Sequence, residues 1–150
     1  MKKSLLLICF ILIGCSIKTE FFIYNVSNDF VTVSYEFHKE SEYGGFVSIP
    51  EIMEINWLSK LEKINSSALH VDLYRKKVVC HIKEGQAIKL GWIANYNSNS
   101  KFKREAFSEN LKVLKIIRKN KGTQIFTGRD SVVDLFKRVS SQRYEIKLNE

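Results

Sequence analysis

The chain has 150 residues, of which 24 are Lys or Arg and 16 are Asp or Glu, and its formal net charge is +8. This length provides one domain with a real hydrophobic core and is too short for two such domains. The basic surplus is concentrated in residues 101–150, which hold 13 of the basic and 6 of the acidic residues. The seven glycines form no Walker loop and no dinucleotide-binding fingerprint, so neither class of nucleotide-binding domain is indicated.

The first element is a short apolar segment that follows Lys2 and Lys3. Its apolar part, Leu5 to Ile13, would span about 14 Å as a helix, roughly half of the hydrocarbon core of a membrane. It is therefore too short for a stable transmembrane helix. A charged start, a short apolar stretch and a small residue at its end are typical of a secretory signal peptide, which we expect to be residues 1–14.

The end of this segment reads Leu12, Ile13, Gly14, Cys15 and resembles the lipobox of bacterial lipoproteins. The resemblance implies that the thiol of Cys15 receives a diacylglycerol, that a peptidase cuts between Gly14 and Cys15, and that the new amine is usually acylated by a chain such as palmitate. Two or three acyl chains, at about 0.8 kcal/mol per buried methylene, hold a protein firmly to a bilayer. The alternative is an ordinary signal peptide with a chance cysteine.

This resemblance covers residues 1–15 only and implies a mature protein in the bacterial cell envelope, anchored to a membrane without spanning it. In enteric-type bacteria an Asp after the cysteine resembles an inner-membrane retention signal, so Ser16 favours the outer membrane over the inner one. Cys9 would leave with the signal peptide and Cys15 would carry lipid, so no intrachain disulfide is expected. Cys80, in a strand-like apolar segment, is expected to be a buried core residue.

The next residues link the anchor to a folded body. Residues 15–20 are expected to be a lipidated tether, at most about 18 Å long when extended, and residues 21–150 a single β-rich domain. The domain begins with two strands around a turn at residues 27–29. Apolar and polar residues alternate cleanly in the second strand, residues 31–37, which predicts one face in a core and the other in solvent.

Residues 50–64 allow two interpretations. An edge strand from Ile49 to Trp57, with Pro50 near its start, is favoured slightly because the surrounding segments are strands. A helix with Pro50 in its first turn is the other possibility, since four apolar side chains would then share one face. These are Met53, Trp57, Leu61 and Ile64.

The rest of the domain continues with strands and turns. Three strands are expected between residues 68 and 94, a long polar loop over residues 95–110, and a hairpin with a Lys-Asn-Lys-Gly turn over residues 111–128. Ser131, with an acidic residue three positions later, makes a start similar to a capping box and predicts one short helix near residues 131–139.

Strands at short spacing, with no long helices between them, predict antiparallel pairing. The fold class we expect is therefore all-β: an antiparallel β-sandwich, Ig-like, with one short helix near residues 131–139. The alternative is an α+β domain with a helix at residues 50–64.

One set of side chains has the chemistry of a metal site. If residues 68–74 and 78–82 form a hairpin, core alternation places His70, Asp72 and His81 together on its outer face, with His81 opposite either Asp72 or His70. Zinc or copper would accept two imidazoles and a carboxylate. A solvated cross-strand pair is the commoner outcome for such residues, so no cofactor is expected.

Basic residues of the last third form a second candidate site, for an anionic surface. Export makes nucleic acid an unsuitable partner, and the anionic surface at hand on a short tether is the membrane itself. The alternative is a set of solvated positions on a loop and a hairpin. The candidates are Lys101, Lys103, Arg104, Lys119 and Lys121.

No catalytic residues are indicated, because the sequence lacks G-x-S-x-G and any recognisable pair of carboxylates. We therefore expect a non-catalytic binding module that contacts another envelope component or protein partner through the loops at residues 38–46 and 95–110. An inhibitor or immunity-type lipoprotein that neutralises a toxin or hydrolase is the alternative. A metal-binding protein or small envelope enzyme is a third possibility.

Overall fold

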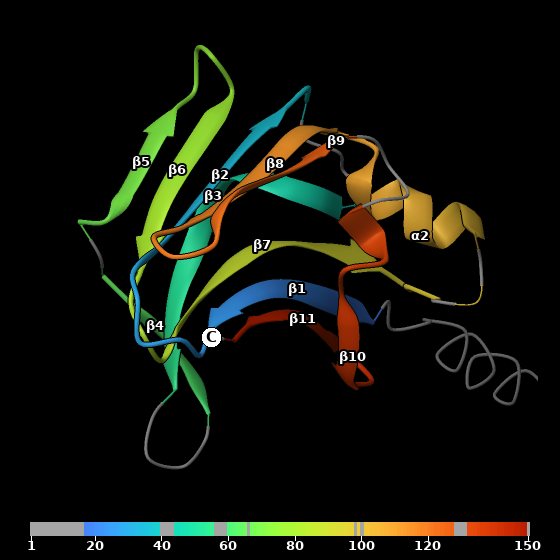
Figure 1. The fold of residues 1–150 in the computed structure, drawn as a ribbon. Helices are drawn as coiled ribbons and strands as arrows, with labels where there is room; N and C mark the ends of the chain where they lie inside the picture. Colours follow the sequence, from blue (N-terminus) through green and yellow to red (C-terminus); the bar gives the residue numbers. More distant parts are fainter. Residues whose placement is uncertain are drawn as a thin grey trace, which may run out of the picture.

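The structure is a computed structural model, and it describes residues 17–39, 44–55, 60–65, 67–97, 99, 101–127 and 132–149. These residues form a strand-rich body with one short helix (Figure 1). The elements are β1 (Lys18–Asn25), β2 (Val31–Phe37), β3 (Gly44–Ile55), β4 (Leu61–Ile64), β5 (Leu69–Asp72), β6 (Lys77–Ile82), β7 (Gln86–Ala94), α2 (Lys101–Ser108), β8 (Leu111–Arg118), β9 (Gly122–Thr127), β10 (Lys137–Ser140) and β11 (Arg143–Leu148).

The strands form two sheets that pack face to face. One has the order β10-β11-β1-β7-β3-β4 and the other the order β5-β6-β2-β8-β9. The pairs are antiparallel except for that of the first and last strands, β1 and β11, which run parallel. The predicted all-β sandwich is confirmed, whereas its Ig-like topology stays a prediction. None of the described helices is long and apolar enough to cross a bilayer.

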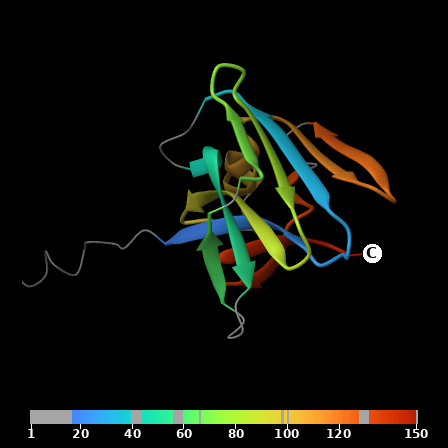
Figure 2. The ribbon, with the colours of Figure 1, turned by 90° about the vertical axis from the view of Figure 1, so that its left-hand side faces the viewer.

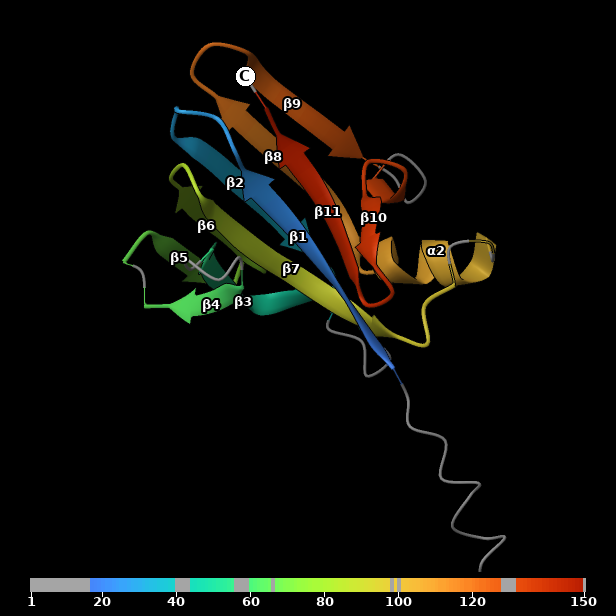
Figure 3. The same cartoon turned by 90° about the horizontal axis from the view of Figure 1, so that it is seen from below.

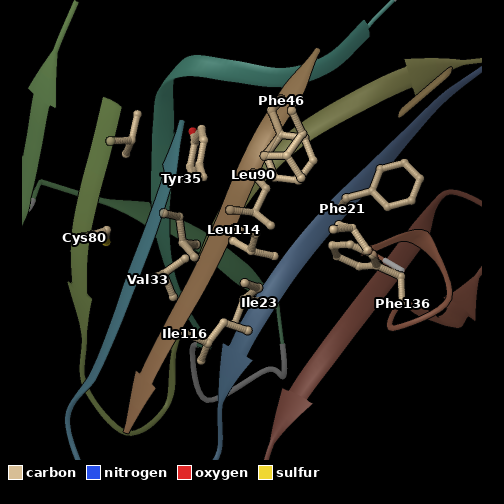
Figure 4. Packing of buried hydrophobic residues seen from close by; sticks show 14 of the residues in the cluster. Phe21, Ile23, Val33, Tyr35, Phe46, Cys80, Leu90, Leu114, Ile116 and Phe136 are labelled. Carbon is tan, nitrogen blue, oxygen red and sulfur yellow. The ribbon is translucent and has the colours of Figure 1, made fainter. Parts of the chain in front are cut away.

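The hydrophobic core fills the space between the sheets (Figure 4). In β2 the apolar side of the predicted alternation is confirmed, because Val31, Val33, Tyr35 and Phe37 are at most 4% exposed. The polar side is not fully in solvent, because Ser34 is 7% exposed. Cys80 on β6 is also fully buried, as expected. A two-residue period therefore decides which side of these strands enters the core.

Aromatic side chains close one end of the sandwich. The ring of Phe107 in α2 stacks on Phe21 of β1 with a centroid distance of 3.7 Å, and Phe136 meets Phe21 edge-on at 5.2 Å. An isolated helix of eight residues is unstable in water, so its packing through Phe107 explains why α2 forms. The prediction of a long polar loop over residues 95–110 is therefore wrong for residues 101–108, which form α2.

The prediction of a short helix near residues 131–139 is partly correct, and the alternative of a helix at residues 50–64 is wrong. Within the predicted helix near residues 131–139, Val132 and Val133 are helical, but residues 137–140 form β10, which pairs with β11. The buried valines satisfy the same apolar pattern through a single turn. Residues 50–55 and 61–64 are strand, so the alternative of a helix at residues 50–64 is contradicted; Trp57 lies outside the described residues. The favoured strand is confirmed, but its predicted edge position is wrong, because β3 pairs with both β7 and β4.

The sandwich has two distinct ends, which Figure 3 shows clearly. At the end where β1 begins, which we call the N-terminal end, lie α2, β10, the start of β3 and the end of β7. At the opposite, distal end lie the β1–β2 turn, the β8–β9 turn and the end of β11. β1 already begins at Lys18, so residues 18–20, which were expected to be tether, belong to the folded body.

Candidate functional site

A polar pocket of about 360 Å³ opens at the distal end of the sandwich. Its walls come from the β1–β2 turn, the β8–β9 turn and the residue after β11, three segments that are far apart in the sequence. The lining residues are Ser27, Asn28, Asp29, Arg118, Asn120, Lys121 and Asn149.

The wall from the β1–β2 turn is held by Asn25, whose side chain is fully buried. Its amide nitrogen donates to the carbonyl oxygens of Asp29, at 2.7 Å, and Ile82, at 3.2 Å. Its amide oxygen accepts from the backbone nitrogen of Ser27, at 3.1 Å, and from the hydroxyl of Ser27, at 2.7 Å. All hydrogen-bonding atoms of this amide are used, so the turn is fixed before any ligand arrives.

The opposite wall carries two cations. Arg118 donates from Nη1 to the carbonyl oxygen of Asn149, at 3.2 Å, and from Nη2 to Oε1 of Gln124, at 3.0 Å. Lys121 Nζ lies 3.4 Å from the same Asn149 oxygen. Arg118 Nε is buried and has no hydrogen-bond partner. The wall therefore has more donors than acceptors, and an acceptor group would complete it.

One contact joins the two walls: Asn120 Nδ2 donates to Oδ2 of Asp29 at 2.6 Å. This bond closes the pocket around a single carboxylate and two cations. The hydroxyl of Ser27 is committed to Asn25. The arrangement therefore suits reversible binding of a polar or anionic group better than nucleophilic chemistry, which needs a base beside the hydroxyl.

The three metal candidates lie on one outer face, as predicted, but they do not converge. β5 pairs with β6 in a third register, with His70 opposite Val79 and Asp72 opposite Lys77, so both predicted registers are wrong. His81 instead bonds Thr32 of β2, with 2.8 Å between Nδ1 and Oγ1. The described part of the chain contains no group of three His, Cys, Asp or Glu residues that could hold a metal ion.

Asp72 has a local structural role. Its Oδ1 accepts from the backbone nitrogen of Arg75 at 2.9 Å, which stabilises the β5–β6 turn. Its other oxygen lies 3.8 Å from Arg75 Nε. The carboxylate that was considered as a ligand is thus used to build a turn.

The five basic candidates are divided between the two ends of the sandwich. Lys101, Lys103 and Arg104 are in α2 at the N-terminal end, whereas Lys119 and Lys121 are exposed in the β8–β9 turn at the distal end. β8 has eight residues and separates the two groups by roughly 25 Å. They do not form a single surface.

The lipobox residues Leu12, Ile13, Gly14 and Cys15 lie outside the described residues. Of the two loops expected to make contacts, the described parts lie at the N-terminal end, and residues 101–110 contribute the buried side chains of Phe107 and Asn110 to the body. The pocket itself was missed. Asp29 and Arg118 are 89 positions apart, and a turn motif gives no sign that a distant cation will face it.

The comparisons with known proteins give no relative: no family model, no curated protein and no solved structure matches this chain.

Proposed function

We propose that this chain is a lipid-anchored bacterial envelope protein, a non-catalytic binding module whose distal end meets its partner. The observation that supports the proposal most strongly is the lipobox-like sequence Leu12 to Cys15. The start of the folded body at Ile17, two residues after Cys15, fits a module that sits directly on the bilayer. Ser16 favours the outer membrane in bacteria that follow the enteric sorting rule.

The geometry of β1 relates the anchor to the pocket. This strand leaves the N-terminal end at Lys18 and reaches the distal end at Asn25, beside the pocket. Eight strand residues span roughly 25 Å, so a body anchored at residue 15 would hold the pocket about that far from the lipid surface. A partner in the space beyond the membrane would meet this end first.

The same geometry assigns different roles to the two basic groups. The α2 residues Lys101, Lys103 and Arg104 would lie near the bilayer, where each basic residue close to an anionic surface contributes about 1 kcal/mol. Lys119 and Lys121 would lie a strand length away, beyond the screening length of about 8 Å at physiological salt. We therefore propose lipid contact for the α2 group and partner contact for the pair beside the pocket.

Fractionation of cells that express the tagged protein tests the anchor. Because a serine hydroxyl cannot form the thioether, Cys15→Ser should either move the protein from the membrane fraction to the soluble fraction or leave it with an uncleaved signal peptide. Cys9→Ser, a matched change within the predicted leader, should leave the protein in the membrane fraction. Equal membrane retention and processing of wild-type and Cys15→Ser proteins would refute the proposal.

A further inference from the structure

The four edge strands of the two sheets differ in how they are protected. β4, β5 and β10 have four residues each, and each carries at least one charged side chain: Glu62 and Lys63, Asp72, and Lys137 and Arg138. Short length and charge are the usual means by which edges avoid pairing with other chains. β9, with the sequence GTQIFT, has six residues and no charged side chain. Among the described strands it is the unprotected edge.

The side chains of β9 are suited to accept another strand. Thr123 and Ile125 are two positions apart, so their side chains lie on the same, outer face of β9. Ile125 is 57% exposed. The neighbouring residue on β8 opposite Thr123 is Ile117, which is 40% exposed. Figure 2 shows the β8–β9 hairpin projecting beyond the rest of the sheet. Phe126 packs against the core on the inner face, so the outer face and the free edge of β9 are the parts that a partner could contact.

The charge of this hairpin indicates the chemistry of the partner. Residues 111–127 contain five basic residues and no acidic one. Lys115 lies opposite Ile125, and two of the lysines form the turn that leads into β9. A strand added to β9 would lie beside these positive charges. Acidic side chains on that strand would therefore raise both the rate and the specificity of its association. The five residues are Lys112, Lys115, Arg118, Lys119 and Lys121.

A second copy of this chain fits the edge poorly, and this step rests on the proposed function. Two copies anchored in one leaflet at residue 15 stand the same way up, so their β9 strands can approach only in parallel. That arrangement brings the two turns with Lys119 and Lys121 side by side, and the like charges repel. An antiparallel pair would separate the turns but would turn one copy away from its membrane.

We propose that β9 binds an extended, acidic segment of a partner polypeptide, which adds a sixth strand to the five-stranded sheet. Main-chain hydrogen bonds along β9 supply affinity, as in other cases of strand addition. A β-branched or aromatic side chain of the segment packs beside Ile125, and its acidic residues lie near Lys115, Lys119 and Lys121. Arg118 at the end of β8 and Lys121 in the turn that leads into β9 both line the pocket, so the segment's end would reach the distal pocket.

A phage library of random octapeptides, selected on the full protein purified in detergent, tests this proposal. The selected peptides should alternate Asp or Glu with β-branched or aromatic residues. Their binding should fall by about tenfold or more with Ile125→Glu, which removes the apolar contact and places a negative charge beside the acidic segment. Val139→Glu is the matched control, because Val139 is 50% exposed on the edge strand β10, and it should leave binding unchanged.

Failure to select any peptide above an uncoated surface would overturn the proposal, as would peptides that bind Ile125→Glu and wild type equally. Thermal unfolding must show that Ile125→Glu folds, and a midpoint within about 4 °C of wild type is expected for an exposed site. Sedimentation equilibrium tests whether a second copy occupies the edge instead: a wild-type dimer that Ile125→Glu abolishes would assign the edge to a second copy and refute a partner segment. Peptide selection is independent of lipidation, so the two proposals can fail separately.

Discussion

Ile17 and Asn95 are joined by two hydrogen bonds at the N-terminal end of the sandwich. The backbone nitrogen of Ile17 donates to Oδ1 of Asn95 at 3.1 Å, and the backbone nitrogen of Asn95 donates to the carbonyl oxygen of Ile17 at 2.8 Å. Asn95 has a φ of 51°, in the left-handed region that Asn tolerates better than most residues. These bonds fix the chain to the body two residues after the predicted lipidation site.

Substitution of Asn95 should loosen this attachment. Asn95→Ala removes the side-chain acceptor and places a less tolerant residue at a positive φ, so the free energy of unfolding should fall by about 1–2 kcal/mol. Asn95→Gly loses the same acceptor but accepts the backbone angle, and should therefore be less destabilising. Urea unfolding of both variants gives the comparison. A larger loss for Asn95→Gly than for Asn95→Ala would contradict it.

Asn110 should be one of the most important polar residues for stability. It is 7% exposed; its Oδ1 accepts from the backbone nitrogen of Phe46 at 3.0 Å, and its Nδ2 donates to the carbonyl oxygen of Phe46 at 2.8 Å. Asn110→Ala leaves both backbone groups without their partner, and should lower the free energy of unfolding by about 2–5 kcal/mol. The exposed Asn97, changed to Ala, should shift it by less than about 0.5 kcal/mol in the same denaturant titration.

The thiol of Cys80 should be inert in the folded protein. Burial disfavours the thiolate and raises the pKa of Cys80 to about 12, so roughly one thiol in ten thousand is ionised at pH 8. Ellman's reagent should therefore find no fast-reacting thiol in the native mature protein and one thiol after unfolding. Cys80→Ala should give none in either state. A fast native thiol that persists in Cys80→Ala would contradict the lipidation of Cys15.

This pKa also has a consequence for stability. The unfolded thiol ionises near its ordinary value of 9, whereas the folded thiol stays neutral. The unfolded state therefore loses a proton first as the pH rises, and stability from this group is complete below pH 9 and decreases above it.

A charge row on the outer face of the six-stranded sheet should make stability fall in acid. Hydrogen bonds from Lys63, at 2.9 Å, and Lys89, at 3.1 Å, lower the pKa of Glu51 below its ordinary value of 4.5. The stabilisation is present above that ordinary value and is lost as the pH falls through the lowered pKa. Lys63→Met should raise the Glu51 pKa, seen by NMR titration, and lower stability at pH 7 by less than about 1 kcal/mol.

The matched control for this row is Lys147→Met on β11, an exposed lysine of the same sheet. It should leave the Glu51 titration unchanged. If Lys63→Met lowered stability by the same amount at pH 2 as at pH 7, the loss would come from packing and not from the ion pair.

Much of the fold could be predicted because side chains alternate along a strand. In β2, every second side chain from Val31 to Phe37 points into the core. Elements that depend on distant partners were not predictable. Nothing local to residues 101–108 shows that Phe107 will stack on Phe21, and the capping-box pattern at Ser131 does not reveal that residues 137–140 pair with β11. The β5–β6 register differs from the two predicted registers by one and two two-residue steps, because parity alone allows several registers.

The candidate site also depends on contacts between segments that are distant in the sequence. Asn25, Ser27 and Asp29 are recognisable as turn residues, but their position beside Arg118 is set by sheet order. The proposed lipid anchor is the opposite case, since the motif that predicts it is contained in four consecutive residues.

Mass spectrometry of the N-terminal peptide from the protein as its native cells produce it tests the central claim most directly. We predict a peptide that begins at Cys15, with a diacylglyceryl thioether on its sulfur and an acyl chain on its amine. A peptide with a free thiol at Cys15, or one that still carries residues 1–14, would contradict it.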